Sequence, residues 1–338
     1  MTKRHIVPTI AAFVLMIMSI SNFNDTTEET FFASFFSTPE LTTKPVAAAV
    51  KPLPVVTAPV EAEAVVTAVN DAPVKKLRKL KDDELTKQLK AKINANPVWR
   101  ELVRKKRMSV GIVDLSDNDA DAKYAAINGR HMMYAASLPK IAVLAAAHDA
   151  IERGELKETE EVKRDMRLMI AKSNNAATTR MIDRVGFTNI ERTMTDPDLK
   201  LYDPEYGGGL WVGKRYAAGG KRHPDPMKGI SHAATTEQIC RYFYLLANDA
   251  LISPGASDKM RSYLVDPELH HKFVSVLDRV APNAKVYRKS GSWSTFHADV
   301  AMVSGPDRNY IITALVDDAR GEQIIRQLGA VLDDLLKQ

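Results

Sequence analysis

Residues 297–316 read HADVAMVSGPDRNYIITALV, two apolar runs on either side of a Gly-Pro-Asp turn signal. Short runs of Val, Ile and aromatic residues separated by a turn predict neighbouring antiparallel strands, here 297–303 and 310–316. A third run, MSVGIVDL at 108–115, has the same character. Strands are therefore expected at both ends of the folded part of the chain.

Helical patterns fill the stretch between these strands. They are expected at 137–153, 158–171, 176–185 and 235–250, and an amphipathic helix at 322–336 closes the chain. Such segregation of strands and helices favours the α+β class. We predict an antiparallel sheet flanked by N- and C-terminal helices, with an inserted all-α subdomain between the two halves of the sheet. A site is then expected where the two parts meet.

The composition excludes several classes of protein. Of the 338 residues 45% are hydrophobic, which is too many for a chain that is disordered throughout. The single cysteine, Cys240, rules out an internal disulfide and a cysteine-based zinc site. The eight histidines include no H-E-x-x-H spacing. We therefore predict neither a metal nor a cofactor.

Positive charge gathers in one segment. The net charge is +5, but residues 75–107 alone hold 13 basic and 4 acidic residues, or +9. This segment is either a basic arm that binds a partner or a helix face in contact with solvent. Because no aromatic platform or reading motif accompanies the charge, we predict no binding of nucleic acid.

The N-terminus has the pattern of an exported protein. Lys3, Arg4 and His5 precede an apolar run at 6–20, which is typical of a secretory signal but short for a membrane span. We predict a signal peptide or membrane anchor at 1–23, with a possible tether through 6–20. A linker rich in Pro, Ala and Thr is expected at 24–74, before a hydrolase domain at 75–338. The protein would be periplasmic, secreted or anchored to the outer face of the inner membrane.

The first candidate motif is Ser137-Leu138-Pro139-Lys140. Ser137 and Lys140 are three residues apart, so both side chains would lie on one face of a helix. A serine hydroxyl is a weak nucleophile until a base removes its proton, and a lysine amine shielded from water can be that base. The alternative is a helix N-cap followed by a surface lysine.

Two further polar triplets stand far along the chain. Ser173-Asn174-Asn175 separates two helices, where Ser173 could relay a proton and Asn175 could hold a substrate amide; the alternative is a plain N-cap. Lys289-Ser290-Gly291 lies in a presumed strand, where a cation and a hydroxyl could bind a carboxylate. Gly291 would let the substrate approach the backbone closely. The alternative for this triplet is a lysine at a strand edge.

In their order along the chain, the three motifs resemble those of the penicillin-recognising serine enzymes, in particular the class A β-lactamase-like branch. The signature of that branch is S-x-x-K, S-D-N and K-T-G. The resemblance covers about residues 108–336, and it implies the β-lactamase/transpeptidase-like fold. Asn174 stands in the place of the usual aspartate and Ser290 in that of the usual threonine.

The resemblance also implies a role for each residue. Ser137 would be the acylated nucleophile, Lys140 its general base or proton relay, and Ser173 the group that passes a proton to the leaving nitrogen. Lys289 and Ser290 would bind the substrate carboxylate. The backbone N–H groups of Ser137 and Ser292 would form the oxyanion hole.

The chain departs from the family pattern where a glutamate normally activates water for deacylation. The E-P-x-L-N loop has its best match in Asp203-Pro204-Glu205-Tyr206-Gly207. Asp203 is one methylene shorter than glutamate, and Glu205 is a second carboxylate that could take the same role. If Asp203 activates the water, Asp203→Asn lengthens the lifetime of the acyl-enzyme. A glycine-rich, basic insertion at 207–222 follows, either a mobile flap or a solvent loop.

The sequence therefore predicts an exported active-site-serine hydrolase of class A β-lactamase type. Ser137 would be acylated by β-lactams or related carboxylate-bearing amides and released by water, which would make the protein a factor in antibiotic resistance. One alternative is a D-Ala-D-Ala carboxypeptidase that acts on peptidoglycan-type peptides. The other is a binding module of the same fold without turnover.

Overall fold

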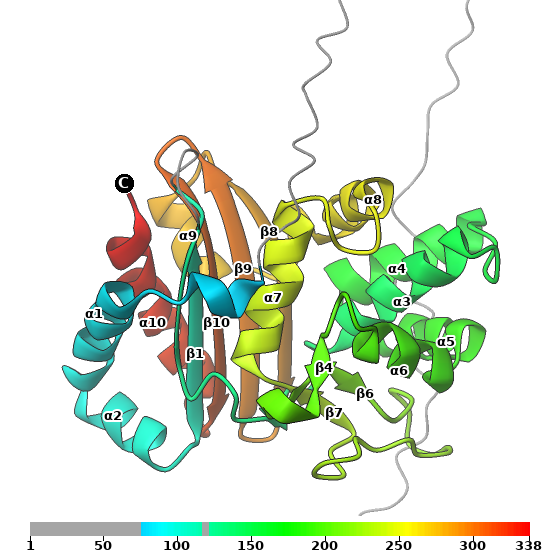
Figure 1. Ribbon diagram of the computed structural model, residues 1–338, viewed down its shortest axis with the longest axis horizontal. Coiled ribbons are helices and arrows are strands. Elements are labelled where there is room, and N and C mark those ends of the chain that lie inside the picture. Colours follow the sequence, from blue (N-terminus) through cyan, green and yellow to red (C-terminus); the bar gives the residue numbers. More distant parts are fainter. Residues whose placement is uncertain (1–75, 117–121) are drawn as a thin grey trace, which may run out of the picture. The chain divides into compact units, whose positions relative to one another are not determined.

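The computed structural model describes residues 76–116 and 122–338 (Figure 1). The chain divides into two units, Met1–Ala68 and Val69–Gln338, and every described residue belongs to the second. The signal or anchor at 1–23 and the linker at 24–74 lie outside the described residues and stay predictions. Among the helices that are described, none has the length and apolar character needed to cross a membrane.

A five-stranded antiparallel sheet forms the centre of the molecule. Its strands are β1 (Met108–Asp114), β2 (Lys123–Ile127), β8 (Lys285–Trp293), β9 (Phe296–Gly305) and β10 (Arg308–Asp317). They lie in the order β2-β1-β10-β9-β8, so strands from both ends of the chain pair at β1 and β10. The predicted α+β class is confirmed.

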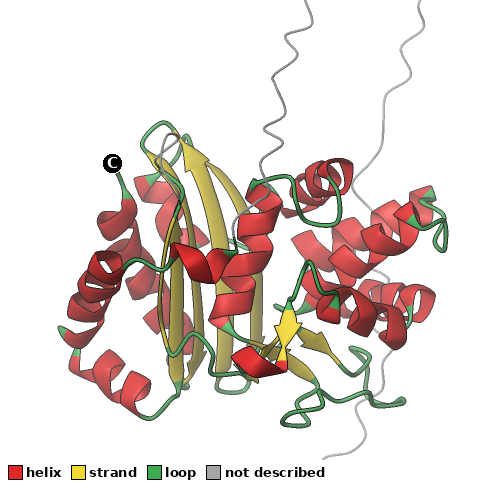
Figure 2. Ribbon diagram, in the orientation of Figure 1, coloured by secondary structure: helices red, strands yellow, loops and turns green. Residues whose placement is uncertain are grey.

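Terminal helices cover one face of the sheet (Figures 1 and 2). These are α1 (Asp83–Asn94), α2 (Pro97–Arg104), α9 (Val274–Val280) and α10 (Gly321–Leu336). Helix α10 places Ile325, Leu328 and Leu332 fully buried against the sheet, as its amphipathic pattern predicts. The basic segment 75–107 therefore folds largely into helices that pack on the sheet.

The inserted helical region lies on the other face (Figure 1). Its helices are α3 (Lys140–Glu152), α4 (Glu160–Ala171), α5 (Asn175–Val185), α6 (Phe187–Thr195), α7 (Thr236–Ala247) and α8 (Pro254–Leu264). Helix α7 lies directly on β1 and β10, where Cys240 is a buried thiol. A Cβ on Gly111 would approach the Cys240 sulfur to 2.9 Å, so glycine allows this close packing.

Short elements connect the helical region to the sheet. A three-stranded sheet contains β3 (Met133–Tyr134), β7 (His232–Ala234) and β6 (Trp211–Val212), and a two-stranded ribbon contains β4 (Tyr202–Asp203) and β5 (Gly208–Gly209). The 3-10 helices are η1 (Leu77–Leu80) and η2 (Pro204–Tyr206). The insertion at 207–222 thus begins one residue before β5 and passes through β5 and β6.

Candidate active site

Ser137 lies in the turn between β3 and α3, whereas the sequence predicted that it would be the first residue of a helix at 137–153. Helix α3 begins at Lys140, with Pro139 as its N-cap residue. The turn is closed by hydrogen bonds from the Leu138 N–H to the Ala135 carbonyl (3.0 Å) and from the Lys140 N–H to the Ser137 carbonyl (3.3 Å). Ser137 is half-buried. The turn holds the Ser137 hydroxyl at the start of a helix, where N–H groups favour negative charge.

Strand β8 passes very close to this turn. A Cβ on Gly291 would lie 2.7 Å from the backbone nitrogens of Ser137 and Leu138, and closer still to the Ala135 carbonyl oxygen. Glycine is therefore needed here because the serine turn itself fills the space beside β8. The close approach brings Ser292, the next residue of β8, near the backbone of Ser137.

The Lys140 side chain is fully buried beside Ser173. Its amine donates to the Ser173 carbonyl (2.6 Å), to Asn175 Oδ1 (2.8 Å) and to Ser173 Oγ (3.3 Å). Within the described residues no carboxylate contacts this amine. Burial therefore lowers the pKa of Lys140 to about 7, which makes the amine a base at neutral pH.

Lys289 approaches the same serine from β8. Its amine is buried and donates to Ser173 Oγ (2.9 Å) and to the Ser290 carbonyl (2.8 Å). Burial, with the nearby charge of Lys140, lowers the pKa of Lys289 well below its usual range. Ser173, with a left-handed φ of 54°, thus receives hydrogen bonds from both amines. The structure brings together five of the residues chosen from the sequence: Lys140, Ser173, Asn175, Lys289 and Ser290.

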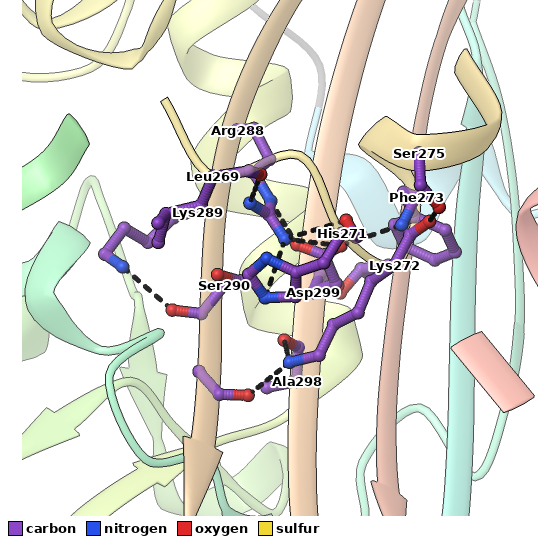
Figure 3. Close-up of polar contacts among 12 residues, drawn as sticks. Leu269, His271, Lys272, Phe273, Ser275, Arg288, Lys289, Ser290, Ala298 and Asp299 are labelled. Carbon is purple, nitrogen blue, oxygen red and sulfur yellow. Dashed lines mark hydrogen bonds and ion pairs between the residues drawn. The ribbon is translucent and has the colours of Figure 1, made fainter. Parts of the chain in front are cut away.

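A polar cluster contacts β8 on the side that faces away from the Lys289 amine (Figure 3). The fully buried Lys272 amine donates to the Gly291 carbonyl (2.6 Å), to Ser292 Oγ (2.8 Å) and to the Ala298 carbonyl (3.1 Å). Burial lowers the pKa of Lys272 to about 8. Figure 3 shows Lys289 extending away from this cluster. Sequence reasoning missed Lys272, because nothing near it in the chain distinguishes it from a surface lysine.

The structure does not bring Asp203 and Glu205 to the serine. Asp203 is buried, and its Oδ2 accepts from Arg78 of η1 at 3.1 Å. Its Oδ1 accepts from the Glu205 N–H at 3.1 Å, and the Glu205 side chain is exposed. Neither carboxylate contacts Ser137 or Lys140. Asp203 thus anchors η2 to the N-terminal segment.

The insertion at 207–222 contributes one residue to the site, Tyr216. Its ring centre lies 4.6 Å from the Lys140 amine, and its hydroxyl donates to the Ala136 carbonyl at 3.0 Å. The ring also contacts the His232 ring, with 4.2 Å between the centres. The motif search missed Tyr216, since a tyrosine in a glycine-rich loop belongs to no catalytic signature. In the described chain, no cluster of His, Cys, Asp or Glu could bind a metal ion.

The fold is that of the penicillin-recognising serine enzymes, and within it Lys140 and Lys289 both contact Ser173. A model of the β-lactamase enzyme family matches residues 84–167 and 161–336. The chain therefore belongs to the β-lactamase enzyme family. A search of curated protein sequences finds no match.

Solved structures show the same fold. A β-lactamase from Sphaerobacter thermophilus is 17% identical, with a TM-score of 0.57 over 74% of this chain and 97% of its own. A β-lactamase from Xanthomonas campestris is 15% identical, with a TM-score of 0.57 over 74% and 98%. A mutant of PBP-A, solved as its acyl-enzyme complex with penicillin G, is 17% identical, with a TM-score of 0.53 over 78% and 99%. At these identities the likeness shows the fold alone.

Proposed function

We propose that Ser137 is the nucleophile of a serine acyl-enzyme reaction on β-lactams or related amides that bear a carboxylate. The observation that supports this proposal is the buried Lys140 amine, which has oxygen partners but contacts no carboxylate in the part of the chain that the structure describes. Such an amine is neutral in a large fraction of molecules near pH 7, so it can accept the Ser137 proton.

Acylation would begin when the Lys140 amine takes the proton of the Ser137 hydroxyl. The Ser137 oxygen attacks the carbonyl carbon of the amide, and the N–H groups of Ser137 and Ser292 stabilise the oxyanion. The C–N bond then breaks, and Ser173 gives its proton to the leaving nitrogen. Lys140 returns a proton to Ser173 through the hydrogen bond between them.

Recognition of the substrate would depend on β8 and α5. Lys289, whose amine donates to the Ser290 carbonyl, would supply positive charge, and the Ser290 hydroxyl would supply a hydrogen-bond donor, so that the two residues attract a carboxylate. Asn175 is exposed and uses its Oδ1 on Lys140, which leaves its amide nitrogen for a substrate carbonyl. Asp203 and Glu205 take no part in this scheme, because their side chains contact none of these residues.

Water would then release the acyl group from Ser137, as in a β-lactamase. The D-Ala-D-Ala carboxypeptidase differs only in its substrate, and the binding module differs in that the adduct persists. The rate of turnover therefore decides between the three alternatives.

The test is covalent labelling of the full chain with a fluorescent penicillin, followed by mass spectrometry of the intact protein. We expect an adduct on Ser137 that Ser137→Ala abolishes and that the matched variant Ser262→Ala, at an exposed serine of α8, retains. Turnover of a chromogenic cephalosporin supports the β-lactamase, and release of D-Ala from a pentapeptide supports the carboxypeptidase. Labelling that survives in Ser137→Ala contradicts the proposal.

We also propose that the protein acts outside the cytoplasm, because a positive stretch precedes the apolar run at 6–20. Cell fractionation of the full chain is the test, with a variant lacking residues 1–23 as the control. The mass of the exported protein distinguishes a cleaved signal from a retained anchor. Equal fractionation of the two proteins contradicts export through this segment.

A further inference from the structure

Hydrogen bonds and an ion pair fix the loop that follows β6 on both sides of Tyr216 in the chain. The Gly213 N–H donates to the Ser231 carbonyl (2.6 Å), and the His223 N–H donates to the Gly213 carbonyl (2.7 Å). Arg215, the neighbour of Tyr216, forms an ion pair with Asp183 of α5 at 2.5 Å. The position of Tyr216 is thus determined by the fold.

The Tyr216 ring lies beside the Lys140 amine, with 4.6 Å between the amine and the ring centre, while the hydrogen bonds of the amine go to Ser173 and Asn175. Its hydroxyl is used on the Ala136 carbonyl, the residue directly before the nucleophile. Burial raises the pKa of the Tyr216 hydroxyl well above its usual range, so the phenol stays neutral and cannot act as a base.

Hydrolysis of an acyl-enzyme requires a water beside these same groups. The water oxygen attacks the ester carbonyl, its proton passes to the Lys140 amine, and the bond between the carbonyl carbon and Ser137 Oγ breaks. Ser137 then recovers a proton from Lys140, and the product leaves as a carboxylic acid. Since no carboxylate of residues 76–116 or 122–338 contacts Lys140, this amine is the base that such a water would need, and the Tyr216 ring lies 4.6 Å from it.

We propose that Tyr216 is a positioning residue that fills the space from which water would reach the Ser137 ester, so that it prolongs the acyl-enzyme state. This inference rests on the proposed acylation of Ser137. It assigns the insertion at 207–222 a purpose that neither a mobile flap nor a plain solvent loop has. The chain then reacts readily with an acyl donor and releases it slowly.

The test follows the decay of the adduct formed with benzylpenicillin, after removal of free drug, by mass spectrometry of the full chain. We expect Tyr216→Ala to shorten the lifetime about tenfold or more, because water enters the space that the ring leaves. Tyr216→Phe keeps the ring and keeps a long lifetime. Tyr206→Ala is the matched control, since the Tyr206 ring lies against Arg78 and not against Lys140.

A second readout separates access from general loosening of the fold. Hydroxylamine attacks the ester directly and gives a hydroxamate, so its rate reports access to the carbonyl. We expect it to release the adduct faster from Tyr216→Ala than from the unaltered chain or Tyr206→Ala. Tyr216→Val provides the same comparison if the alanine variant does not fold.

The outcomes distinguish the two proposals. If the unaltered chain forms no adduct, the proposed acylation of Ser137 fails, and the role of Tyr216 fails with it. If an adduct forms but decays within seconds in the unaltered chain, or decays equally in Tyr216→Ala and Tyr216→Val, the acylation stands and the role of Tyr216 is overturned.

Discussion

At the scale of single residues, three lysines with buried amines contact Ser173 or strand β8. Lys140, Lys272 and Lys289 each donate to carbonyl or side-chain oxygens, and none forms an ion pair with a carboxylate within the described residues. Removal from water disfavours the charged form of an amine. Burial therefore lowers the pKa of all three amines, and that of Lys140 falls to about 7, where the amine can act as a base.

The pKa of Lys140 leads to a pH dependence for acylation. The neutral amine is the active form, so the rate of labelling by a fluorescent penicillin should rise with pH through about 7 and then level off. Stopped-time labelling between about pH 5 and about pH 9 measures this profile. A rate that stays constant or falls as the pH passes 7 contradicts Lys140 as the base.

Gly291 provides a second prediction at this scale. In Gly291→Ala the added Cβ would collide with the Ser137 turn, 2.7 Å from the Ser137 nitrogen, and would shift the nucleophile. We expect acylation to slow about 100-fold while the fold is kept. Gly255→Ala in α8 is the control, because a Cβ there meets only Ser253 Oγ at 4.0 Å. Equal labelling rates for both variants would show that the close approach has no bearing on the reaction.

At the scale of elements, the sequence predicted those strands and helices that depend mainly on the residues of the element itself. The β9–β10 hairpin follows from its two apolar runs and their turn, and α10 from its amphipathic stripe. The start of α3 did not follow, because contact with β8 helps to form the turn that keeps Ser137 out of the helix. Nor did the position of Asp203 follow, because Arg78, its partner, lies 125 residues away in the chain.

The ion pair between Arg78 of η1 and Asp203 of β4 predicts how Asp203→Asn behaves. The Asp203 carboxylate binds Arg78 and the Glu205 N–H, so its loss weakens an anchor and leaves the chemistry of Ser137 untouched. We expect the lifetime of the penicillin adduct to be unchanged and the free energy of unfolding to fall by about 1 kcal/mol. Mass spectrometry and urea unfolding measure the two quantities. A longer lifetime would restore Asp203 as the activator of water.

At the scale of the whole molecule, the site exists because the sheet and the helical region meet along β8. Strand β8 is an edge strand, and it brings Lys289 to Ser173, which lies between α4 and α5. The sequence motifs identified these groups and suggested that they meet at a junction. The motifs did not identify the polar cluster that holds this edge strand, because the residues of the cluster come from three separate segments of the chain.

The buried ion pair of Arg288 and Asp299 is the strongest part of this support. Arg288 Nε donates to Asp299 Oδ1 at 2.7 Å, and Asp299 Oδ2 accepts from the Phe273 N–H at 3.1 Å, just before α9. The two side chains are 2% and 0% exposed. Asp299 therefore joins β8, β9 and the start of α9, and its removal would leave the Arg288 charge buried without a carboxylate partner.

We expect Asp299→Ala to lower the free energy of unfolding by about 3 to 5 kcal/mol. Glu160→Ala, which removes an exposed pair with Lys163, should cost less than about 1 kcal/mol and serves as the control. Urea unfolding of the full chain measures both. The structure also predicts that labelling of Ser137 falls in Asp299→Ala, because β8 carries Lys289 and Gly291. If the two variants unfold at the same urea concentration, the buried pair does not hold the edge strand.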